Sequence, residues 1–328
     1  MKILVIQTAF LGDVIIATAI LEKLHQFYPD AKIDFVLRKG NEQVLEGHPF
    51  VRNVFIWNKK EKKYSSLISL IKKIRTEKYN YIINLQRFAA SGLITALGGA
   101  NHTIGFNKNP LSFFFEKKFP HIITADGTQH ETDRNQQLIA ALTDEHKALP
   151  RLYPLQADYQ KTAAFKSQSY ICIAPASVWF TKQFPVEKWQ ELIAKIISTT
   201  NHYIYLLGSP ADKELCSRLA EGSLQRIKNL AGEFTILQTA AVMKDAVMNY
   251  VNDSAPMHIA SSMNAPVTTI YNSTVPGFGF GPLSDKSFII ETKVELTCRP
   301  CGLHGYAKCP LGHFRCATTI QMSQFESR

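Results

Sequence analysis

Short apolar runs alternate with amphipathic segments along the first third of the chain. An apolar run of about four to eight residues is typical of a buried strand, and apolar residues about three or four positions apart are typical of a helix that packs on one face. This alternation predicts a doubly wound parallel α/β sheet. The predicted strands are 2–7, 33–37, 54–57, 79–85 and 103–106, and the predicted helices are 14–27, 44–48, 67–75 and 91–97.

The same alternation begins again in the second half, after a stretch that interrupts it. Residues 149–164 contain Pro150 and Pro154, and we interpret them as an interdomain linker. The chain is therefore predicted to form two Rossmann-like domains, 1–155 and 156–328. Beyond the linker the predicted strands are 170–174, 203–207, 246–251 and 267–271, with a helix from Val186; a further helix is expected before the linker at 130–142.

Composition fits this picture of a globular α/β protein. With 328 residues, 45% hydrophobic and 20% charged, the chain is long enough for two domains that each have a core. No apolar run reaches the roughly 18 residues that cross a bilayer. The apolar N-terminus is interpreted as a strand rather than a signal peptide because Asp13 interrupts it. We expect a cytoplasmic protein.

The formal net charge of +10 has its excess in the first domain. Between residues 58 and 120 there are twelve lysines and arginines against three glutamates. Such a cluster indicates an anionic partner, which could be nucleic acid, an anionic membrane surface or a phosphorylated substrate, or else a solvated basic face. The aromatic and lysine residues of 113–119 fit either a segment at a membrane interface or a helix that faces the core.

A second feature is the polar stretch between the predicted strands 246–251 and 267–271. Asp253 or Ser254 can cap a helix there, and Pro256 suits its first turn. A helix that starts at the carboxyl edge of a strand presents free N–H groups and a positive dipole to a phosphate, and His258 could add a further donor. The alternative is one more layer of an α/β core.

The turn after the first strand has only Gly12, so it lacks the G-x-G-x-x-G pattern of dinucleotide-binding enzymes. This makes a hydride-transferring enzyme a poor hypothesis. Near the C-terminus four cysteines have the spacing C-x2-C-x7-C-x6-C, which suggests a structural zinc site or a group of reduced thiols. They are Cys298, Cys301, Cys309 and Cys316.

The stretch 252–260, Asn-Asp-Ser-Ala-Pro-Met-His-Ile-Ala, resembles the donor-binding motif of the ADP-heptose:lipopolysaccharide heptosyltransferases, which form glycosyltransferase family 9. Alanine stands at position 255, where the family usually has glycine. The resemblance implies that this stretch binds a nucleotide-sugar donor. The implied contacts are Asp253, Ser254, Ala255, Pro256, Met257 and His258.

Further family motifs occur in the expected order. Gly12-Asp13 resembles the family's Gly-Asp-Val, whose aspartate is proposed as the general base; the alternative is a carboxylate that only favours the start of a helix. Lys182 resembles the family's lysine before an aromatic–proline pair, and a compact charge suits a leaving phosphate. The other implied donor contacts are Gly12, Ser177, Thr181, Asp212 near the ribose, and Gly232 and Glu233 near the adenine.

The resemblance implies two domains that face each other across a cleft in the GT-B fold. It implies an inverting transfer of heptose from ADP-L-glycero-D-manno-heptose to the inner core of a lipid-anchored lipopolysaccharide precursor, with no cofactor and no catalytic metal. The donor would bind the second domain and the acceptor the first, through Lys59, Lys60, Lys62 and Lys63.

On this hypothesis we expect a monomer that contacts the anionic inner surface of the cytoplasmic membrane. Two alternatives stay open. One is the same scaffold with another nucleotide sugar, and the other is a basic nucleotide- or RNA-binding protein without catalysis. No RNP-like pattern of aromatic and basic residues is visible, so no nucleic-acid partner is expected.

Overall fold

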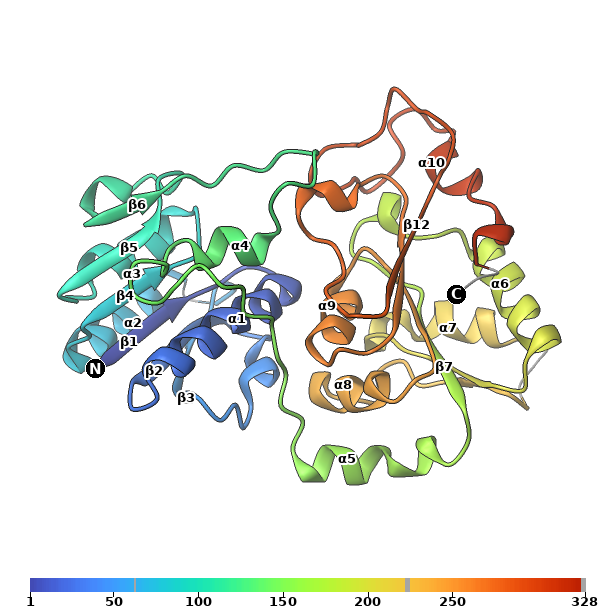
Figure 1. Cartoon of the computed structure of the whole chain (residues 1–328), viewed down its shortest axis with the longest axis horizontal. Helices are drawn as coiled ribbons and strands as arrows, with labels where there is room; N and C mark the ends of the chain where they lie inside the picture. Colours follow the sequence, from blue (N-terminus) through green and yellow to red (C-terminus); the bar gives the residue numbers. More distant parts are fainter. Residues whose placement is uncertain (62, 222–224, 326–328) are drawn as a thin grey trace. The chain divides into compact units, whose positions relative to one another are not determined.

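A computed structural model describes residues 1–61, 63–221 and 225–325. The chain divides into two compact units, one formed by 1–124 and 129–153 and the other by 125–128 and 154–328. The short segment 125–128 belongs to the second unit, where the Gly127 N–H donates to the Gly277 carbonyl at 3.1 Å. Figure 1 labels most of the helices and strands of both units.

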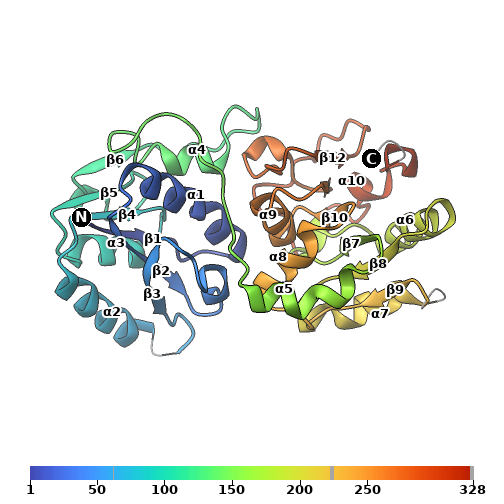
Figure 2. The same ribbon diagram turned by 60° about the horizontal axis from the view of Figure 1, so that its bottom comes forward.

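The first unit is a doubly wound parallel sheet. Its six described strands lie in the order β3-β2-β1-β4-β5-β6, and every neighbouring pair is parallel. Helices α1 and α4 contact each other on one face, and α2 and α3 on the other (Figure 2). The strands are β1 (Lys2–Ile6), β2 (Lys32–Arg38), β3 (Val51–Trp57), β4 (Tyr81–Asn84), β5 (His102–Phe106) and β6 (Lys117–Phe119), and the helices are α1 (Leu11–Phe27), α2 (Lys63–Glu77), α3 (Ala89–Leu97) and α4 (Glu131–Gln136).

The second unit repeats this topology. Its described strands lie in the order β12-β11-β10-β7-β8-β9, again all parallel. Helices α8 and α9 pack together, as do α6 and α7. The strands are β7 (Tyr170–Ala174), β8 (Tyr203–Leu206), β9 (Ile227–Asn229), β10 (Asn249–Asn252), β11 (Val267–Tyr271) and β12 (Ser287–Glu291), and the helices are α5 (Gln156–Thr162), α6 (Val186–Thr199), α7 (Lys213–Ala220), α8 (Ile236–Lys244), α9 (Ala255–Ser262) and α10 (Arg315–Thr318).

Apolar strand residues form the core of each unit, as the sequence pattern predicts. In the first unit Leu4 and Ile82 from the sheet pack with Ile74 of α2 and are fully buried. In the second unit Ile173 of β7 packs with Trp189 of α6. The prediction of two doubly wound α/β domains is confirmed.

The strand order fixes where each sheet can bind a ligand. In the first unit the order reverses between β1 and β4, and in the second between β7 and β10. Loops that leave the carboxyl ends of such strands diverge to opposite faces and open a crevice, which is where open α/β sheets bind ligands. The segments after β1, β7 and β10 carry the candidate residues Asp13, Lys182 and Ser254, respectively.

Several predicted elements are wrong in detail. The helix expected at 44–48 is a 3-10 turn, Glu42–Leu45, followed by Gly47 at φ +67° and Pro49. Segment 113–119 is not a core-facing helix: a 3-10 turn (Ser112–Phe114) leads into edge strand β6, and Phe113 and Phe114 are exposed. These short segments lack the length that would separate helix from strand by periodicity alone.

Two further boundaries differ. The helix expected at 130–142 ends at Gln136, after which the chain continues with tighter turns of the 3-10 type, in which for example the Ile139 N–H donates to the Gln136 carbonyl. The stretch interpreted as a linker contains α5, whose N-terminus is capped by the Asp158 carboxylate accepting from the Leu155 N–H at 2.9 Å. Helix α5 packs on α8 and so belongs to the second unit. Within the described residues, no helix is long and apolar enough to span a bilayer.

Candidate active site

Asp13 is held at the start of α1, directly after β1. Helix α1 begins at Leu11, so Asp13 lies in its first turn rather than in the preceding loop where the sequence pattern placed it. Its Oδ2 accepts a hydrogen bond from the Phe10 N–H at 3.1 Å, and Gly12 before it is partly exposed. Asp13 is itself partly exposed, so one carboxylate oxygen is fixed by the backbone while the group keeps access to a substrate.

The loop that leads into α1 is fixed by side chains from neighbouring elements. The Lys59 Nζ donates to the Thr8 carbonyl at 2.6 Å, and the Asn41 Nδ2 donates to the Ala9 carbonyl at 3.1 Å. The Ala9 N–H donates to the Gln7 Oε1 at 3.1 Å. Asp13 is therefore presented by a loop with three anchored backbone groups.

The environment of Asp13 makes it a better base than a solvated aspartate. Burial first, and then the negative charge of Glu131, raise the pKa of Asp13 to about 6; the Phe10 N–H and the charge of Arg38 oppose this rise. A carboxylate with a pKa near the working pH is a stronger proton acceptor and is still ionised at neutral pH.

Glu131, at the start of α4, had no assigned role from the sequence. It is buried, with its carboxylate 3.0 Å from the His121 Nε2 and 2.8 Å from the Arg134 Nε. Burial alone would raise the pKa of Glu131, but the hydrogen bond from His121 and the charges of His121 and Arg134 hold it below its usual value. Glu131 therefore stays ionised and acts on Asp13 as a fixed negative charge.

In the second unit, α9 begins at Ala255 directly after β10, as the motif predicts. Ser254 is the N-cap, in an extended conformation, and Pro256 lies in the first turn. Ala255 has no positive φ, so alanine in place of the family's glycine is not strained. Met257 and His258 are buried in the same helix. The helix N-terminus opens at the carboxyl edge of β10, where an anion can bind.

Lys182 lies at the end of a 3-10 turn, Phe180–Lys182, that follows β7. Its Nζ is 2.7 Å from the Asp253 Oδ2, and the Thr274 hydroxyl donates to the same oxygen at 2.6 Å. The Lys182 and Asp253 side chains are 15% and 9% exposed, so the pair has a defined geometry and still reaches the surface. The structure thus brings together Lys182, Asp253 and the N-terminus of α9.

The other predicted residues of the β7 loop are Thr181 and Ser177. Thr181 is buried, and its Oγ1 accepts from the Ser273 hydroxyl at 3.0 Å. Ser177 is partly exposed, and its carbonyl accepts from the Gln183 Nε2 at 2.6 Å. Thr181 therefore acts within the protein framework, whereas Ser177 is accessible to solvent.

The residues expected near the nucleoside lie at the carboxyl ends of β8 and β9. Asp212 caps its own turn: its Oδ2 accepts from both the N–H and the hydroxyl of Ser209 at 2.7 Å. Gly232 has φ +80°, and its N–H donates to the Gly208 carbonyl at 2.9 Å. Glu233 is exposed, 3.8 Å from the Lys213 Nζ. Glu233 is thus the more accessible of the two carboxylates.

Comparison with known proteins identifies this arrangement. Residues 67–304 match the family model described as glycosyltransferase family 9 (heptosyltransferase). The chain belongs to glycosyltransferase family 9. It is 26% identical to lipopolysaccharide heptosyltransferase 3 of Escherichia coli in an alignment of 279 residues that covers 81% of this chain and 82% of that protein.

Solved structures agree on the fold of this family 9 glycosyltransferase. A family 9 glycosyltransferase from Veillonella parvula superposes with a TM-score of 0.85 at 22% identity, covering 98% of this chain and 94% of that one. The E. coli heptosyltransferase WaaC with ADP-2-deoxy-2-fluoro heptose superposes with a TM-score of 0.70 at 22% identity, covering 89% and 93%. These structures confirm the paired Rossmann-like domains expected of a GT-B glycosyltransferase. The family model and the curated relative confirm the assignment to the heptosyltransferase family.

The lysines expected to bind the acceptor have different surroundings in this glycosyltransferase. Lys59 is half-buried over the Trp57 ring at 4.8 Å, and burial, with the nearby charges of Arg38 and Lys63, lowers the pKa of Lys59 to about 8. Lys60 and Lys63 are exposed. Lys62 lies outside the described residues. Lys59 therefore belongs with the Asp13 loop, and Lys60 and Lys63 remain candidates for contact with an anionic partner.

The four C-terminal cysteines are free thiols that lie near one another. Burial first, and then the proximity of Cys301, Cys309 and Cys298, raise the pKa of Cys316 to about 11. Across residues 1–61, 63–221 and 225–325, however, no three histidine, cysteine or acidic side chains are placed to hold a metal ion. Structural zinc and reduced thiols therefore both remain open for these cysteines.

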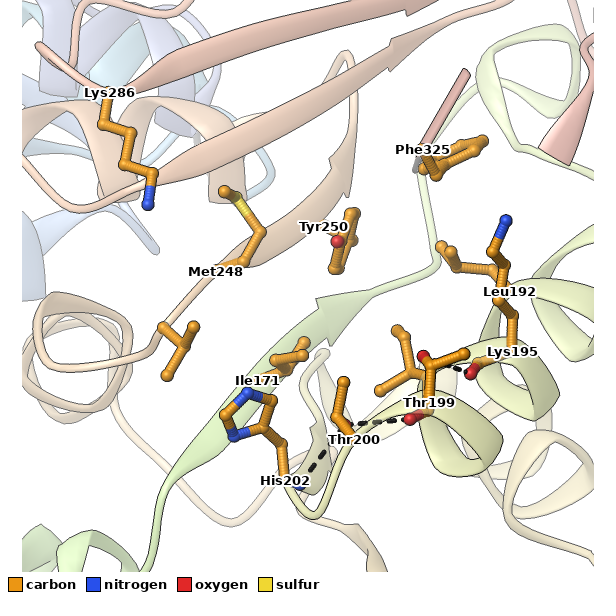
Figure 3. A pocket seen from close by; sticks show the side chains of 12 residues that line it. Ile171, Leu192, Lys195, Thr199, Thr200, His202, Met248, Tyr250, Lys286 and Phe325 are labelled. Atoms are coloured by element: carbon orange, nitrogen blue, oxygen red, sulfur yellow. Dashed lines mark hydrogen bonds between the residues drawn. The ribbon is translucent and has the colours of Figure 1, made fainter. Parts of the chain in front are cut away.

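A pocket of about 480 Å³ lies at the opposite edge of the second sheet from Lys182. Its lining residues precede the strands rather than follow them: Thr200 and His202 lead into β8, Met248 into β10 and Lys286 into β12. Figure 3 shows His202 and Lys286 beside the apolar side chains of Ile171, Met248 and Tyr250. Since open α/β sheets bind ligands at their carboxyl edge, this pocket is separate from the candidate active site.

Proposed function

We propose that this family 9 glycosyltransferase transfers L-glycero-D-manno-heptose from its ADP-linked donor to an inner-core sugar of lipopolysaccharide, with inversion at the anomeric carbon. The proposal rests on two groups, one in each unit, that follow strands at which the strand order of the sheet reverses. One is an aspartate whose pKa is raised towards neutrality, and the other is a lysine beside a helix N-terminus. A single displacement at the anomeric carbon needs a base to take the proton of the acceptor hydroxyl. It also needs a positive charge to stabilise the leaving group.

The first unit would supply the base. Asp13 takes the proton from the acceptor hydroxyl as that oxygen attacks the anomeric carbon. The Phe10 N–H holds the second carboxylate oxygen, so the group keeps one orientation during proton transfer. A single attack opposite the leaving group inverts the anomeric configuration and needs no covalent sugar–enzyme intermediate.

The second unit would bind the donor and stabilise the departing ADP. As the bond from the anomeric carbon to the phosphate oxygen breaks, negative charge gathers on the diphosphate. Lys182 and the N-terminus of α9 lie together to receive that charge. Asp253 keeps the lysine in place before the donor arrives. Asp212 would lie near the donor ribose, and the exposed Glu233 near the adenine.

The donor assignment is tested by incubating the protein with ADP-heptose and candidate acceptors, and reading the products by mass spectrometry. ADP-glucose and UDP-N-acetylglucosamine serve as controls, because the alternative is the same scaffold acting on a different nucleotide sugar. Transfer from ADP-heptose alone supports the proposal, and preference for another donor overturns it. Family membership favours either enzyme over a non-catalytic nucleotide- or RNA-binding protein.

Activity is expected to fall on the acid side with a midpoint near pH 6, because the base must be ionised and the pKa of Asp13 is raised to about 6. Replacing Glu131 with Gln removes a negative charge that contributes to this rise, so the pKa of Asp13 and the midpoint should move to lower pH. The amide keeps an oxygen that can accept from Arg134. The measurement is kcat/KM for the acceptor across a pH series, with exposed Glu145→Gln as the control. Equal midpoints in all three proteins would contradict an action of Glu131 on Asp13.

We also propose that the start of α2 contacts the anionic membrane that carries the acceptor. Tyr64 and Ile68 are 74% and 56% exposed there, beside the exposed Lys60 and Lys63. Exposed apolar groups next to lysines suit a membrane interface, and each lysine contributes about 1 kcal/mol near an anionic surface.

The variant Lys60→Ala/Lys63→Ala is therefore expected to bind anionic vesicles about tenfold or more weakly at low salt, and to differ less at high salt. The control variant Lys293→Ala/Lys308→Ala removes two exposed charges from the second unit. Sedimentation with vesicles measures both. Equal binding by the two variants would mean that α2 is only a solvated surface.

The protein is expected to act as a monomer, which light scattering tests.

A further inference from the structure

The segment between the second and third C-terminal cysteines packs directly on the loop that carries Lys182. The Thr181 N–H donates to the Tyr306 carbonyl at 3.1 Å, and the Tyr306 N–H donates to the Thr181 Oγ1 at 2.7 Å. These reciprocal bonds tie Tyr306 to the residue immediately before Lys182.

The loop after β11 completes this connection. The Cys301 N–H donates to the Ser273 carbonyl at 2.7 Å. Ser273 in turn bonds Thr181 twice, from its N–H to the Thr181 carbonyl at 3.3 Å and from its hydroxyl to the Thr181 Oγ1 at 3.0 Å. Thr181 is thus held from two sides, by Tyr306 and by a loop that Cys301 fixes.

The Arg299 side chain anchors the same loop by donating hydrogen bonds to the carbonyls of loop residues. Its Nε donates to the Asn272 carbonyl at 2.7 Å, and its Nη2 donates to the Thr274 carbonyl at 2.8 Å. Both loop residues act on the ion pair: the Asn272 Nδ2 donates to the Lys182 carbonyl at 3.1 Å, and the Thr274 hydroxyl donates to Asp253. Arg299 therefore orders the residues that hold both Lys182 and its partner.

Gly305 lies directly against the loop that carries Lys182. It has φ +75°, and a Cβ at this position would lie 2.8 Å from the Thr181 Oγ1, 3.0 Å from the Lys182 Cγ and 3.2 Å from the Ser273 Oγ. A real Cβ essentially never comes within 3.0 Å of another atom, so a methyl group here must displace the Thr181 side chain and press on the Lys182 side chain. The backbone of the cysteine-rich segment at Gly305 therefore packs directly against the Lys182 loop.

We propose that residues 299–306 are a positioning element of the donor site, which sets where the Lys182 ammonium lies relative to the N-terminus of α9. The proposal rests on the proposed function in one respect, namely that Lys182 acts on the leaving diphosphate. The competing account is that this segment only closes off the C-terminal part of the fold. If the segment positions Lys182, a substitution at Gly305 should move the Lys182 side chain. If the segment only closes off the fold, the same substitution should leave Lys182 where it is.

The first test compares Gly305→Ala with Gly312→Ala. Gly312 lies in the same cysteine-rich region and has φ +71°, but a Cβ there meets nothing within 4 Å. Both variants impose a similar backbone penalty on the folded state, and only one displaces the Lys182 loop. Gly305→Ala is expected to lower kcat/KM for the donor by about tenfold or more, since small misplacements of a catalytic group are costly. Gly312→Ala should stay within about twofold of wild type. Equal loss in both variants, or loss in neither, overturns the proposal.

The second test asks whether Gly305 acts through Lys182. In a Lys182→Ala background, Gly305→Ala should have almost no further effect on donor kcat/KM, because the group that it displaces is gone. If the two losses multiply independently, the segment acts by another route and the proposal is wrong.

The third test uses no donor, so it stands even if the natural nucleotide sugar is a different one. Reductive methylation with 13C-formaldehyde gives each lysine an NMR signal, and Lys182→Arg assigns that of Lys182. The Lys182 signal should shift in Gly305→Ala and stay unchanged in Gly312→Ala. An unchanged signal in both variants overturns the positioning role, whereas a shifted signal with no ADP-heptose activity in wild type overturns only the proposed donor.

Discussion

Replacing Asp13 with Asn is expected to lower kcat by about 10²–10⁴, the usual contribution of a general base. The amide has nearly the shape of the carboxylate and keeps an oxygen for the Phe10 N–H, so the start of α1 should be preserved. What it loses is the ability to accept the acceptor's proton. Affinity for ADP should not change, because the proposed donor site belongs to the second unit.

The same variant should not lose stability, which separates a catalytic from a structural role. The folded-state pKa of Asp13 is raised from 3.8 to about 6, so the protonated form is favoured on folding. Above about pH 6 the ionised Asp13 carboxylate therefore lowers the free energy of unfolding. This destabilisation disappears as the pH falls through about 6 and the carboxylate becomes protonated in the folded state. Asn is neutral at every pH, so the thermal midpoint at about pH 7 should stay the same or rise.

Two measurements decide the role of Asp13. Product formation under saturating donor and acceptor gives kcat, and calorimetric titration gives ADP affinity for the wild type and the variant. Glu145→Gln, an exposed change in the same unit, controls for the loss of one negative charge. If Asp13→Asn keeps more than about a tenth of wild-type turnover, Asp13 is not the base.

The parts of the site that could be predicted from the sequence are those encoded in one continuous stretch. The cap at Ser254, Pro256 in the first turn and the flanking strands all lie within about one βαβ unit, and α9 begins where that local pattern puts it. Lys182 was identified from its resemblance to the family's lysine before an aromatic–proline pair, and it lies in the turn after β7. Even the unusual Ala255 fits, because this position is helical rather than left-handed.

The neighbours of these residues could not be predicted, because the fold alone brings them together. Glu131 is far from Asp13 in the sequence, and nothing near it signals that α4 packs on α1. Lys59 belongs to a run of lysines that look equivalent, yet it alone among the described members donates to the Thr8 carbonyl before Asp13. Charge patterning identifies the run but cannot rank its members.

Secondary-structure errors have the same physical origin. Lys117–Phe119 is a strand only because β5 offers an unpaired edge. The supposed linker contains α5 because α8 provides a surface for it to pack on. In both cases tertiary contact decides a conformation that short segments of mixed pattern leave open. The cysteine spacing raised the question of a metal, whereas the residues between the cysteines prove to contact the Lys182 loop.

Replacing Lys182 with Ala is expected to lower kcat/KM for ADP-heptose by about 10²–10³, because the positive charge that we propose stabilises the departing diphosphate is lost. Lys63→Ala should instead act on the acceptor, since Lys63 is exposed in the first unit. Steady-state kinetics in which each substrate is varied in turn separate the two effects. If Lys63→Ala impaired donor use and Lys182→Ala impaired acceptor use, the assignment of substrates to the two units would be reversed.

A loss of activity in Lys182→Ala needs one further control, because the change also leaves the Asp253 carboxylate without its cation. A largely buried, unpaired carboxylate destabilises the folded state, so this variant could lose activity by unfolding. The double variant Lys182→Ala/Asp253→Asn removes both charges and lets the amide oxygen accept from the Thr274 hydroxyl. Its thermal midpoint should recover towards wild type while its donor kcat/KM stays low. Recovery of activity together with stability would mean that Lys182 serves only to neutralise Asp253, and that the N-terminus of α9 stabilises the leaving group without it.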